Sequence, residues 1–377
     1  MSAAPATAES ALANPALDRR FMQLALALGR RGLGRTWPNP AVGAVVVKNG
    51  AVVGRGWTQP GGRPHAETEA LTRAGRDAKG ATLYVTLEPC SHQGKTPPCV
   101  DAIIRAGIVR VVSAFGDPNP EVAGQGYAKL RERGIAVETG LCEQEAAHQH
   151  AGHVLRMRDG RPYVLLKIAA SADGKAGLPG RKPAAITGEA ARARVHQMRA
   201  QSDAILVGIG TVLSDDPHLT CRLPGMNGCS PVRVILDAKL RIPLATSVVG
   251  TARDTPTWVF ASPGPSAMAE DILKTKGVEV FRVEGKNGRL DLGAVLKALA
   301  ARGITRLMVE GGPTVAAAFL AADLVDEAAL FRSPEELGAG IDVLEGAPLT
   351  ALTQSPRLKA ASTETVGGDT LEMFERA

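Results

Sequence analysis

The chain has 377 residues, a formal net charge of +6 and a sequence pI of about 9.2. Its hydrophobic content of 45% and charged content of 22% are ordinary for a soluble globular protein and exclude intrinsic disorder, while the length predicts two domains. The chain has no run of about 18 apolar residues, no charged-then-apolar leader and an odd set of five cysteines, so we expect a cytoplasmic protein without membrane spans or a disulfide framework.

The first half of the chain alternates between strand-like and helix-like patterns. Residues 1–14 are rich in Ala and predict a disordered tail, and Asn14-Pro15 predicts a helix start because Pro suits the first helical position. Strands are predicted at 42–47, 51–55, 82–87, 109–114 and 135–139, and helices at 66–74, 97–104 and 127–133. This order predicts an α/β/α layered domain over residues 15–145.

Residues 146–160 are interpreted as a connecting helix and linker. They contain His148, His150 and His153, for which a metal site is one interpretation. Because this spacing does not repeat on one helical face, we favour a solvated helix.

The second half predicts another α/β domain, over residues 161–377. Its strands are predicted at 164–169, 204–207, 232–236, 257–261, 278–283 and 306–309, and its helices at 189–199, 290–301 and 314–321. Because strands and helices alternate, a mostly parallel sheet is expected.

The ordered set His65, Glu67, Cys90 and Cys99 is the strongest chemical signal in the chain. One imidazole and two thiolates offer three ligands to a tetrahedral Zn²⁺ and leave the fourth position for water, as in a catalytic site. Glu67 is placed to shuttle protons, and H-x-E followed by P-C and a further Cys is typical of zinc deaminases. The alternative is that these are two buried cysteines and a surface histidine without a metal. This alternative explains any one of the residues taken alone, but it does not explain their occurrence as an ordered set.

A second pattern, Glu310-Gly311-Gly312-Pro313-Thr314, indicates a strand end followed by a helix start. Glycines allow a ligand to approach, and a helix start offers N–H groups to phosphate, although a plain turn is the alternative. The basic pI suggests anionic partners. Because Lys and Arg are scattered and aromatic residues make up only 3% of the chain, phosphorylated small molecules fit at least as well as nucleic acid.

Five segments in the first half form a series: Asn39-Pro40-Ala41-Val42-Gly43, His65-Ala66-Glu67, Thr86-Leu87-Glu88-Pro89-Cys90-Ser91-His92, Gly94-Lys95-Thr96-Pro97-Pro98-Cys99 and Gly116-Asp117-Pro118-Asn119-Pro120. With them, this half resembles the cytidine-deaminase-like domain of the bifunctional deaminase–reductase family of riboflavin biosynthesis. The resemblance implies hydrolytic deamination of a diaminopyrimidinone that carries a ribosylamino 5-phosphate.

The resemblance also assigns residues in this half. It implies that Asn39 contacts the pyrimidine and that His92 and Lys95 lie near the phosphoribosyl group. The family commonly has His where this chain has Thr58, which puts one substrate contact in doubt.

The second half carries a series of its own: Lys167 to Gly174, Arg199 to Ile205, Gly210 to Pro217, Val309 to Thr314, Val325-Asp326-Glu327 and Gly367-Gly368-Asp369. With them, it resembles the family's reductase domain, which has a dihydrofolate-reductase-like α/β fold and uses NADPH. The resemblance implies that Lys167 and Glu310 assist opening of the ribosyl ring before hydride reaches its first carbon.

By position, the resemblance implies two sets of binding residues. The NADPH set is Ala169, Ala185, Thr211, Asp215, Gly312, Pro313, Thr314, Val315, Ala316, Ala317 and Ala318. The substrate set of the reductase is Pro183, Arg199, Leu219, Arg222 and Glu310. Arg199 and Arg222 are expected as phosphate clamps because a guanidinium offers forked donors.

The chain departs from the family at Pro183 and Ala185, where relatives have a substrate serine and a cofactor tryptophan. We therefore keep two alternatives to the bifunctional enzyme: a deaminase with a degenerate reductase domain, and a nucleic-acid-editing zinc deaminase. A non-catalytic zinc-stabilised interaction protein is a third. We expect a homo-oligomer (dimer or tetramer), no nucleic-acid or membrane partner, and leave the choice between NADPH and NADH open on sequence alone.

Overall fold

The computed structural model describes residues 14–119, 123–178, 185–264 and 267–377. The chain divides into two compact units. The first unit comprises the chain up to Gly32 together with Pro40–Val154, and the second comprises Leu33–Asn39 together with Leu155–Ala377. The sequence-derived domain limits at 145 and 161 stay predictions.

Two expectations concern the ends and the surface of the chain. The predicted tail 1–14 lies outside the described residues except for Asn14, whose side chain accepts from the N–H groups of Ala16 and Leu17 and so caps the first helix. Within the described ranges, no helix has the length and apolar character that crossing a bilayer requires.

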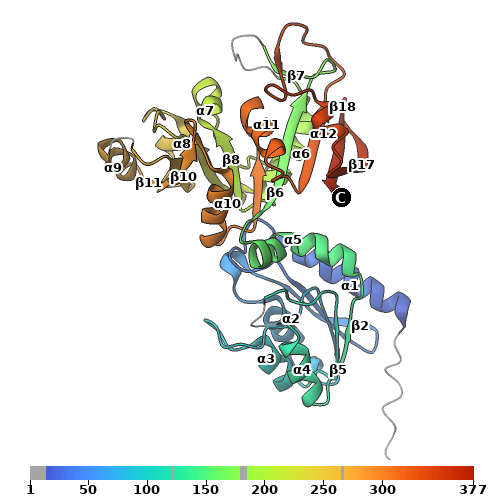
Figure 1. The fold of residues 1–377 in the computed structure, drawn as a ribbon. Helices are drawn as coiled ribbons and strands as arrows, with labels where there is room; N and C mark the ends of the chain where they lie inside the picture. Colours follow the sequence, from blue (N-terminus) through green and yellow to red (C-terminus); the bar gives the residue numbers. More distant parts are fainter. Residues whose placement is uncertain (1–13, 120–122, 179–184, 265–266) are drawn as a thin grey trace, which may run out of the picture. The chain divides into compact units, whose positions relative to one another are not determined.

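The first unit contains, in chain order, α1 (Pro15–Gly29), β1 (Gly43–Lys48), β2 (Ala51–Trp57), α2 (Ala66–Ala74), β3 (Thr82–Val85), α3 (Cys99–Arg105), β4 (Arg110–Ser113), α4 (Gln125–Glu132), β5 (Ala136–Thr139) and most of α5 (Glu143–Asp159) (Figure 1). Among the described residues the strand order is β2-β1-β3-β4-β5. Strand β1 runs antiparallel to β2 and β3, whereas β3, β4 and β5 are parallel.

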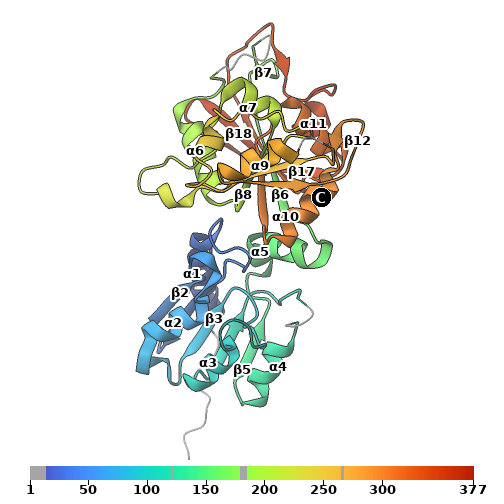
Figure 2. The same ribbon diagram turned by 90° about the vertical axis from the view of Figure 1, so that its left-hand side faces the viewer.

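Helices cover both faces of this sheet because its strands are apolar on both sides. Ala44 and Val46 of β1 pack in one buried cluster with residues of α2, α3 and α4. Val45 and Val47 point to the opposite face and pack with residues of α1 and α5. Figure 2 shows α2, α3 and α4 beside the strands of this unit. The predicted α/β/α layering is confirmed.

Helix α2 lies directly on β2 because two residues of that strand are glycines. A Cβ atom on Gly56 would lie 2.4 Å from the carbonyl oxygen of Ala66, and one on Gly54 would lie 2.2 Å from that of Ala70. Glycine allows this close approach of two backbones. The contact fixes the start of α2, which is where His65 and Glu67 lie.

The sequence interpretation of α5 as a solvated helix is wrong for two of its histidines. His150 is 2% exposed and His153 is 8% exposed. The Nε2 atom of His150 lies 3.1 Å from Thr86 Oγ1, and that of His153 lies 3.1 Å from Asp117 Oδ1. Both imidazoles are therefore buried groups of the first unit, each bonded through Nε2 while its Nδ1 has no hydrogen-bond partner among the described residues. The spacing of histidines along one helix gives no signal of such burial.

The second unit is built around a larger sheet (Figure 1). Its elements are β6 (Tyr163–Ala170), β7 (Lys175–Gly177), α6 (Glu189–Ala200), β8 (Ala204–Gly208), α7 (Ile209–Asp215), β9 (Val232–Leu236), α8 (Ser247–Gly250), β10 (Thr257–Ala261), α9 (Ala267–Thr275), β11 (Val278–Arg282), β12 (Gly285–Lys286), β13 (Arg289–Leu290), α10 (Leu292–Ala301), β14 (Arg306–Val309), α11 (Pro313–Ala321), β15 (Glu327–Arg332), β16 (Ile341–Asp342), α12 (Thr350–Thr353), β17 (Leu358–Val366) and β18 (Asp369–Arg376).

The order of the strands in this sheet, over the described part of the chain, is β11-β10-β9-β8-β14-β6-β15-β18-β17. Every neighbouring pair from β11 to β15 is parallel, and only the pairs that involve β18 are antiparallel. The predicted mostly parallel sheet is confirmed. Strands β15, β17 and β18 are elements that the sequence patterns did not predict.

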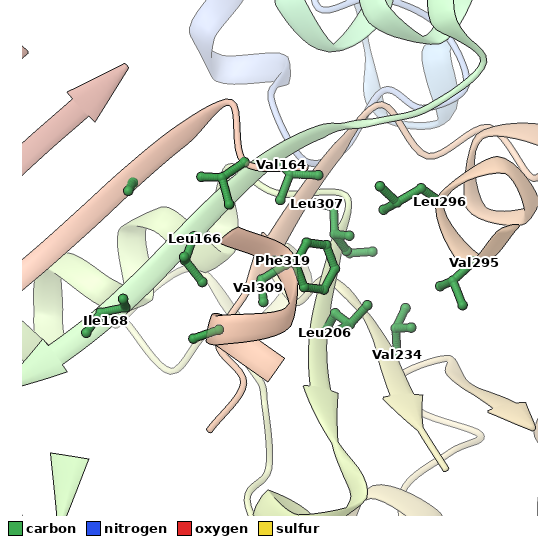
Figure 3. Close-up of a cluster of buried hydrophobic side chains, with 14 of the residues drawn as sticks. Val164, Leu166, Ile168, Leu206, Val234, Val295, Leu296, Leu307, Val309 and Phe319 are labelled. Carbon is green, nitrogen blue, oxygen red and sulfur yellow. The ribbon is translucent and has the colours of Figure 1, made fainter. Parts of the chain in front are cut away.

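The core of the second unit lies between this sheet and helices α10 and α11. Figure 3 shows Leu166 of β6, Leu206 of β8 and Val309 of β14 gathered around Phe319 of α11. These four side chains are fully buried, and each contributes roughly 1.5–3 kcal/mol by its removal from water. The opposite face of the sheet is covered by α6, α7, α8 and α9.

Candidate active sites

The three predicted zinc ligands come together at the starts of two helices. His65 is the N-cap residue of α2, and Cys99 is the first residue of α3. Cys90 lies in the segment that joins β3 to α3. The Nδ1 atom of His65 lies 3.6 Å from Cys90 Sγ and 3.3 Å from Cys99 Sγ.

This donor set fits a zinc ion. Ligand bonds of about 2.1 Å to nitrogen and about 2.3 Å to sulfur, at a tetrahedral angle, separate the ligand atoms by about 3.6 Å. The three ligand atoms all lie within 4.8 Å of one another. The backbone N–H of Cys99 donates to Cys90 Sγ at 3.3 Å, and bonds from the Cys99 thiol and His65 lower the pKa of the Cys90 thiol. Thiolate is the form that binds a metal.

Glu67 lies in the first turn of α2 and is 4% exposed. Burial raises the pKa of Glu67 to about 7, although the neighbouring His65 opposes this shift. A carboxyl group that titrates near neutral pH can both accept and return a proton. Buried beside the ligand atoms, Glu67 has the position and the chemistry of a proton shuttle.

The remaining first-unit residues have more varied surroundings. His92 and Lys95 are exposed in the segment between the two cysteines. Arg63, two residues before His65, donates through Nη1 to Thr96 Oγ1 of that segment. Asn39 is the last residue of the segment Leu33–Asn39, which belongs to the second unit. Its backbone N–H donates to Thr36 O at 3.0 Å.

Thr58 supports the backbone of the first unit. It is 2% exposed, and its Oγ1 accepts from the N–H of Val42 at 3.0 Å. The hydroxyl is therefore already engaged in a hydrogen bond within the first unit.

Glu88 is a buried acidic residue to which sequence reasoning assigned no role. It accepts from the backbone N–H groups of Gly124 at 3.0 Å and Gly126 at 2.9 Å, with longer bonds from Asp117 and Tyr127. It lies two residues before Cys90 and so ties the ligand segment to the start of α4. The sequence feature that could have identified Glu88 is its place in the Thr-Leu-Glu-Pro-Cys motif.

The second unit contains a cavity of about 690 Å³, here called the large cavity. It lies at the carboxyl ends of β8 and β14, where open α/β sheets bind ligands. It is lined by many of the predicted reductase residues: Lys167, Ala169, Ala185, Arg199, Thr211, Asp215, Leu219, Arg222, Glu310, Gly312, Pro313 and Ala316.

A small cavity of about 370 Å³ adjoins it. Thr211 and Gly312 line both cavities, and Thr314, Val315 and Ala318 line the small one. Ala317 packs against the apolar core instead. Pro183 lies outside the described residues.

Glu310 is the centre of the charged cluster in the large cavity. Arg199 donates to it through Nε at 2.9 Å and through Nη2 at 3.0 Å, and Lys167 Nζ lies 3.5 Å from Oε1. Burial by itself raises the pKa of Glu310. The positive charges of Lys167 and Arg199 lower it by more, so the pKa lies below its ordinary value. Glu310 is therefore a carboxylate at neutral pH.

His196 is a cavity residue that sequence reasoning missed. It lies on α6 one turn before Arg199, and both side chains line the large cavity. The backbone N–H of Arg222 donates to His196 Nδ1 at 3.4 Å. Burial lowers the pKa of His196, and Arg199 and Arg222 lower it further. The sequence feature that could have identified His196 is its spacing of three residues from Arg199, which places both side chains on the same face of a helix.

Comparison with known proteins identifies each unit by itself. The family described as the cytidine and deoxycytidylate deaminase zinc-binding region matches residues 15–115. The family described as the RibD C-terminal domain matches residues 162–371.

Full-length relatives match both halves together. The riboflavin biosynthesis protein RibD of Aquifex aeolicus is 43% identical over 96% of this chain and 99% of its own. That of Escherichia coli is 41% identical over 93% of this chain and 97% of its own. The solved structure of Acinetobacter baumannii RibD is 36% identical, with a TM-score of 0.86, over 97% of this chain and 100% of its own.

Another solved structure is named for both activities. It is a diaminohydroxyphosphoribosylaminopyrimidine deaminase/5-amino-6-(5-phosphoribosylamino)uracil reductase from Thermotoga maritima. It is 36% identical, with a TM-score of 0.84, and the match covers 97% of this chain and 100% of that one.

Proposed function

Because this chain belongs to the RibD family of riboflavin biosynthesis proteins, we propose that its two candidate sites catalyse two consecutive reactions. The chain is a bifunctional enzyme that combines a zinc-dependent deaminase with an NADPH-dependent reductase. The first substrate is 2,5-diamino-6-(5-phosphoribosylamino)pyrimidin-4-one, and the second is 5-amino-6-(5-phosphoribosylamino)uracil.

In the first reaction, water replaces an amino group of the pyrimidine and ammonia leaves. His65, Cys90 and Cys99 hold Zn²⁺, which when bound makes water nucleophilic at neutral pH. Glu67 takes a proton from the attacking water and returns it to the ring nitrogen and the leaving amine. Asn39 contacts the pyrimidine, and His92 and Lys95 contact the phosphoribosyl group.

The burial of Glu67 beside the three ligand atoms carries this assignment. We expect Glu67→Gln to keep its zinc, because no ligand changes, and to lose ammonia release about 1,000-fold, because the amide cannot accept the proton. Zinc content and ammonia release are measured on the same preparation. Full activity in Glu67→Gln would contradict the role and favour a non-catalytic zinc protein.

In the second reaction, the ribosyl group becomes a ribityl group. Bound NADPH supplies the hydride. Lys167 and Glu310 move protons at the ring oxygen, so that the ring opens to an imine at the first sugar carbon; the imine gains the hydride at carbon and a proton at nitrogen. Arg199 and Arg222, which both line the large cavity, hold the phosphate, and Thr211, Asp215 and Gly312 contact the cofactor.

A degenerate reductase is the rival within the family. Ala185 favours it, since a large aromatic contact is missing from the cavity wall. The ion-pair cluster of Lys167 and Glu310 opposes it, because that cluster keeps its charged groups at the cavity. NADPH oxidation with the deaminated substrate separates the two, and no turnover would leave only a deaminase.

Three further expectations rest on sequence reasoning and family likeness. We propose that the enzyme acts in the cytoplasm, as a dimer or tetramer, on free phosphoribosyl pyrimidines rather than on nucleic acid. Ammonia release from the free substrate and from RNA, compared at equal site concentration, tests the last of these. Light scattering of the purified chain measures the oligomeric state.

A further inference from the structure

Arg63 connects the two segments that carry the zinc ligands, and the proposed chemistry gives it no role. It precedes His65 by two residues, and its Nη1 donates to Thr96 Oγ1 in the segment between the two ligand cysteines. The hydrogen bond to Cys90 raises the pKa of His65, whereas the positive charge of Arg63 opposes that rise. The guanidinium of Arg63 is therefore within electrostatic reach of a zinc ligand.

Most of the hydrogen-bonding capacity of Arg63 is unused. A guanidinium carries five N–H donors. Within the described ranges, the hydroxyl of Thr96 is the one acceptor bonded to Arg63, and no carboxylate forms an ion pair with it. Arg63 is half-buried, so part of its hydration is lost without a charged partner from the chain. A half-buried cation with free donors favours an anion from outside the chain.

The space beside Arg63 is bordered by a second basic side chain. A Cβ atom on Gly94 would lie 3.4 Å from Arg63 Nη2 and 3.9 Å from His92 Nε2. Apart from the chain neighbours of Gly94, no other heavy atom of the described residues would lie within 4 Å of it. Both nitrogen atoms thus border one open space above the backbone of Gly94, which has no side chain to fill it. Lys95 follows directly and adds a further positive charge to this exposed segment.

We propose that Arg63 binds the 5-phosphate of the deaminase substrate, together with His92 and Lys95. This inference rests on the proposed deaminase function and adds a binding residue to it. The Nε and Nη2 edge of a guanidinium matches two oxygen atoms of a phosphate. Because Thr96 engages Nη1, it orients the side chain and leaves that edge of Arg63 available.

A purely structural tie is the rival role for Arg63. In that case its bond to Thr96 would only hold the two ligand segments together, and the loss of this bond would weaken the site for every substrate. The two roles differ in whether the effect of substitution depends on the phosphate of the substrate.

The test uses the full zinc-loaded chain and two substrates, the phosphoribosylamino diaminopyrimidinone and the same compound without its phosphate. We expect Arg63→Gln to raise KM of ammonia release about tenfold or more for the phosphorylated substrate. Its kcat, its zinc content and its KM for the dephosphorylated substrate should stay within about twofold of wild type. Arg63→Lys should recover part of the lost affinity, since it keeps the charge without the fork.

Two control variants separate the charge from the tie. Thr96→Val removes the bond to Arg63 and keeps the cation, so KM should rise less than about threefold. Arg105→Gln removes an exposed positive charge at the end of α3, in the same unit, and should leave all constants near wild type. An equal rise of KM for both substrates in Arg63→Gln, or a tenfold rise in Thr96→Val, would overturn the inference.

Binding of the phosphorylated substrate to Glu67→Gln, measured by calorimetry, gives a readout that needs no turnover. Adding Arg63→Gln to this variant should weaken binding at least about tenfold, whereas adding Arg105→Gln should leave it unchanged. These substitutions all lie in the first unit, so binding by the second unit is common to the three chains. Equal affinity with and without Arg63 would contradict the proposal.

Two further outcomes are decided by the same comparison. If Arg63→Gln fails to fold, Arg63→Lys takes its place in both experiments. If the wild type releases no ammonia, the deaminase function is refuted, while the binding comparison still decides whether Arg63 holds the phosphate.

Discussion

The zinc site and the large cavity balance their charges in different ways. In the first unit, two thiols and the buried Glu67 gather beside one imidazole, so the negative charge of the ligands calls for a metal cation. In the second unit, the carboxylate of Glu310 is matched by Arg199 and Lys167 from the chain itself. The first site needs a metal ion to balance its charge, whereas in the second the chain's own ion pairs balance the charge of Glu310.

This difference predicts that the two sites can be disabled one at a time. Each unit has its own buried core, and the residues of each site lie within one unit, apart from Asn39. Substitutions at one site should therefore leave the other reaction intact.

The largest effect is expected from Cys90→Ala, which removes one of three ligands. Zinc content should fall to a small fraction of one per chain, and ammonia release should fall about 1,000-fold or more. NADPH oxidation with deaminated substrate should stay near wild type. Metal analysis and the two assays check this, with Cys142→Ala as the control for a buried cysteine away from the site. Equal loss of both activities would break the comparison.

Lys167→Met is the matching change in the second unit. Met keeps the length of the side chain and removes the charge that lies 3.5 Å from Glu310. We expect NADPH oxidation to fall about 100-fold, within the usual range for loss of a proton donor, and ammonia release to stay unchanged. A wild-type rate of NADPH oxidation would show that Lys167 is only a cavity-wall residue.

A smaller effect is expected where the chain departs from its family. Ala185 is exposed and lines the large cavity, so Ala185→Trp should restore a large aromatic contact. Burying such a side chain contributes roughly 1–3 kcal/mol, so Kd for NADPH should fall about tenfold. Fluorescence titration measures it, and Ala185→Ser serves as the control without an aromatic ring. An unchanged Kd in Ala185→Trp would mean that this wall does not touch the cofactor.

The smallest effect concerns stability and pH in the first unit. Burial, together with the neighbouring His153, lowers the pKa of His150 to about 3. At pH values below the unfolded-state pKa of about 6.5, the imidazole of His150 binds a proton in the unfolded chain but stays neutral in the folded chain. The free energy of unfolding should therefore drop by about 1.4 kcal/mol between pH 7.5 and 5.5.

Denaturant unfolding at several pH values checks the His150 prediction. The variant His150→Gln, which can still bond to Thr86, should lose this part of the pH dependence. An unchanged slope in the variant would assign the pH dependence to other groups.

The sequence predicted most of the fold and the zinc site because their signals are local. His65, Glu67, Cys90 and Cys99 lie within one short stretch, and the parallel strands of both sheets are apolar runs bounded by turns. Strand β17 escaped prediction because nearly all of it is exposed, so it lacks an apolar pattern. It is a strand by virtue of pairing with β18.

Long-range contacts were beyond sequence reasoning for a different reason. The burial of His150 depends on what packs against α5, and the fork between Arg199 and Glu310 joins residues 111 positions apart. Both features depend on which elements the fold brings together. The sequence alone does not reveal which distant elements pack against each other.

The two glycines of β2 have a consequence for how the deaminase site responds to change. Because α2 rests on the main chain at Gly54 and Gly56, the height of Glu67 above the sheet is set by backbone thickness and not by side-chain rotamers. The site therefore has a rigid reference surface. Repacking apolar side chains elsewhere in the first unit leaves that reference in place, whereas one added methyl group at either glycine displaces the proton shuttle itself.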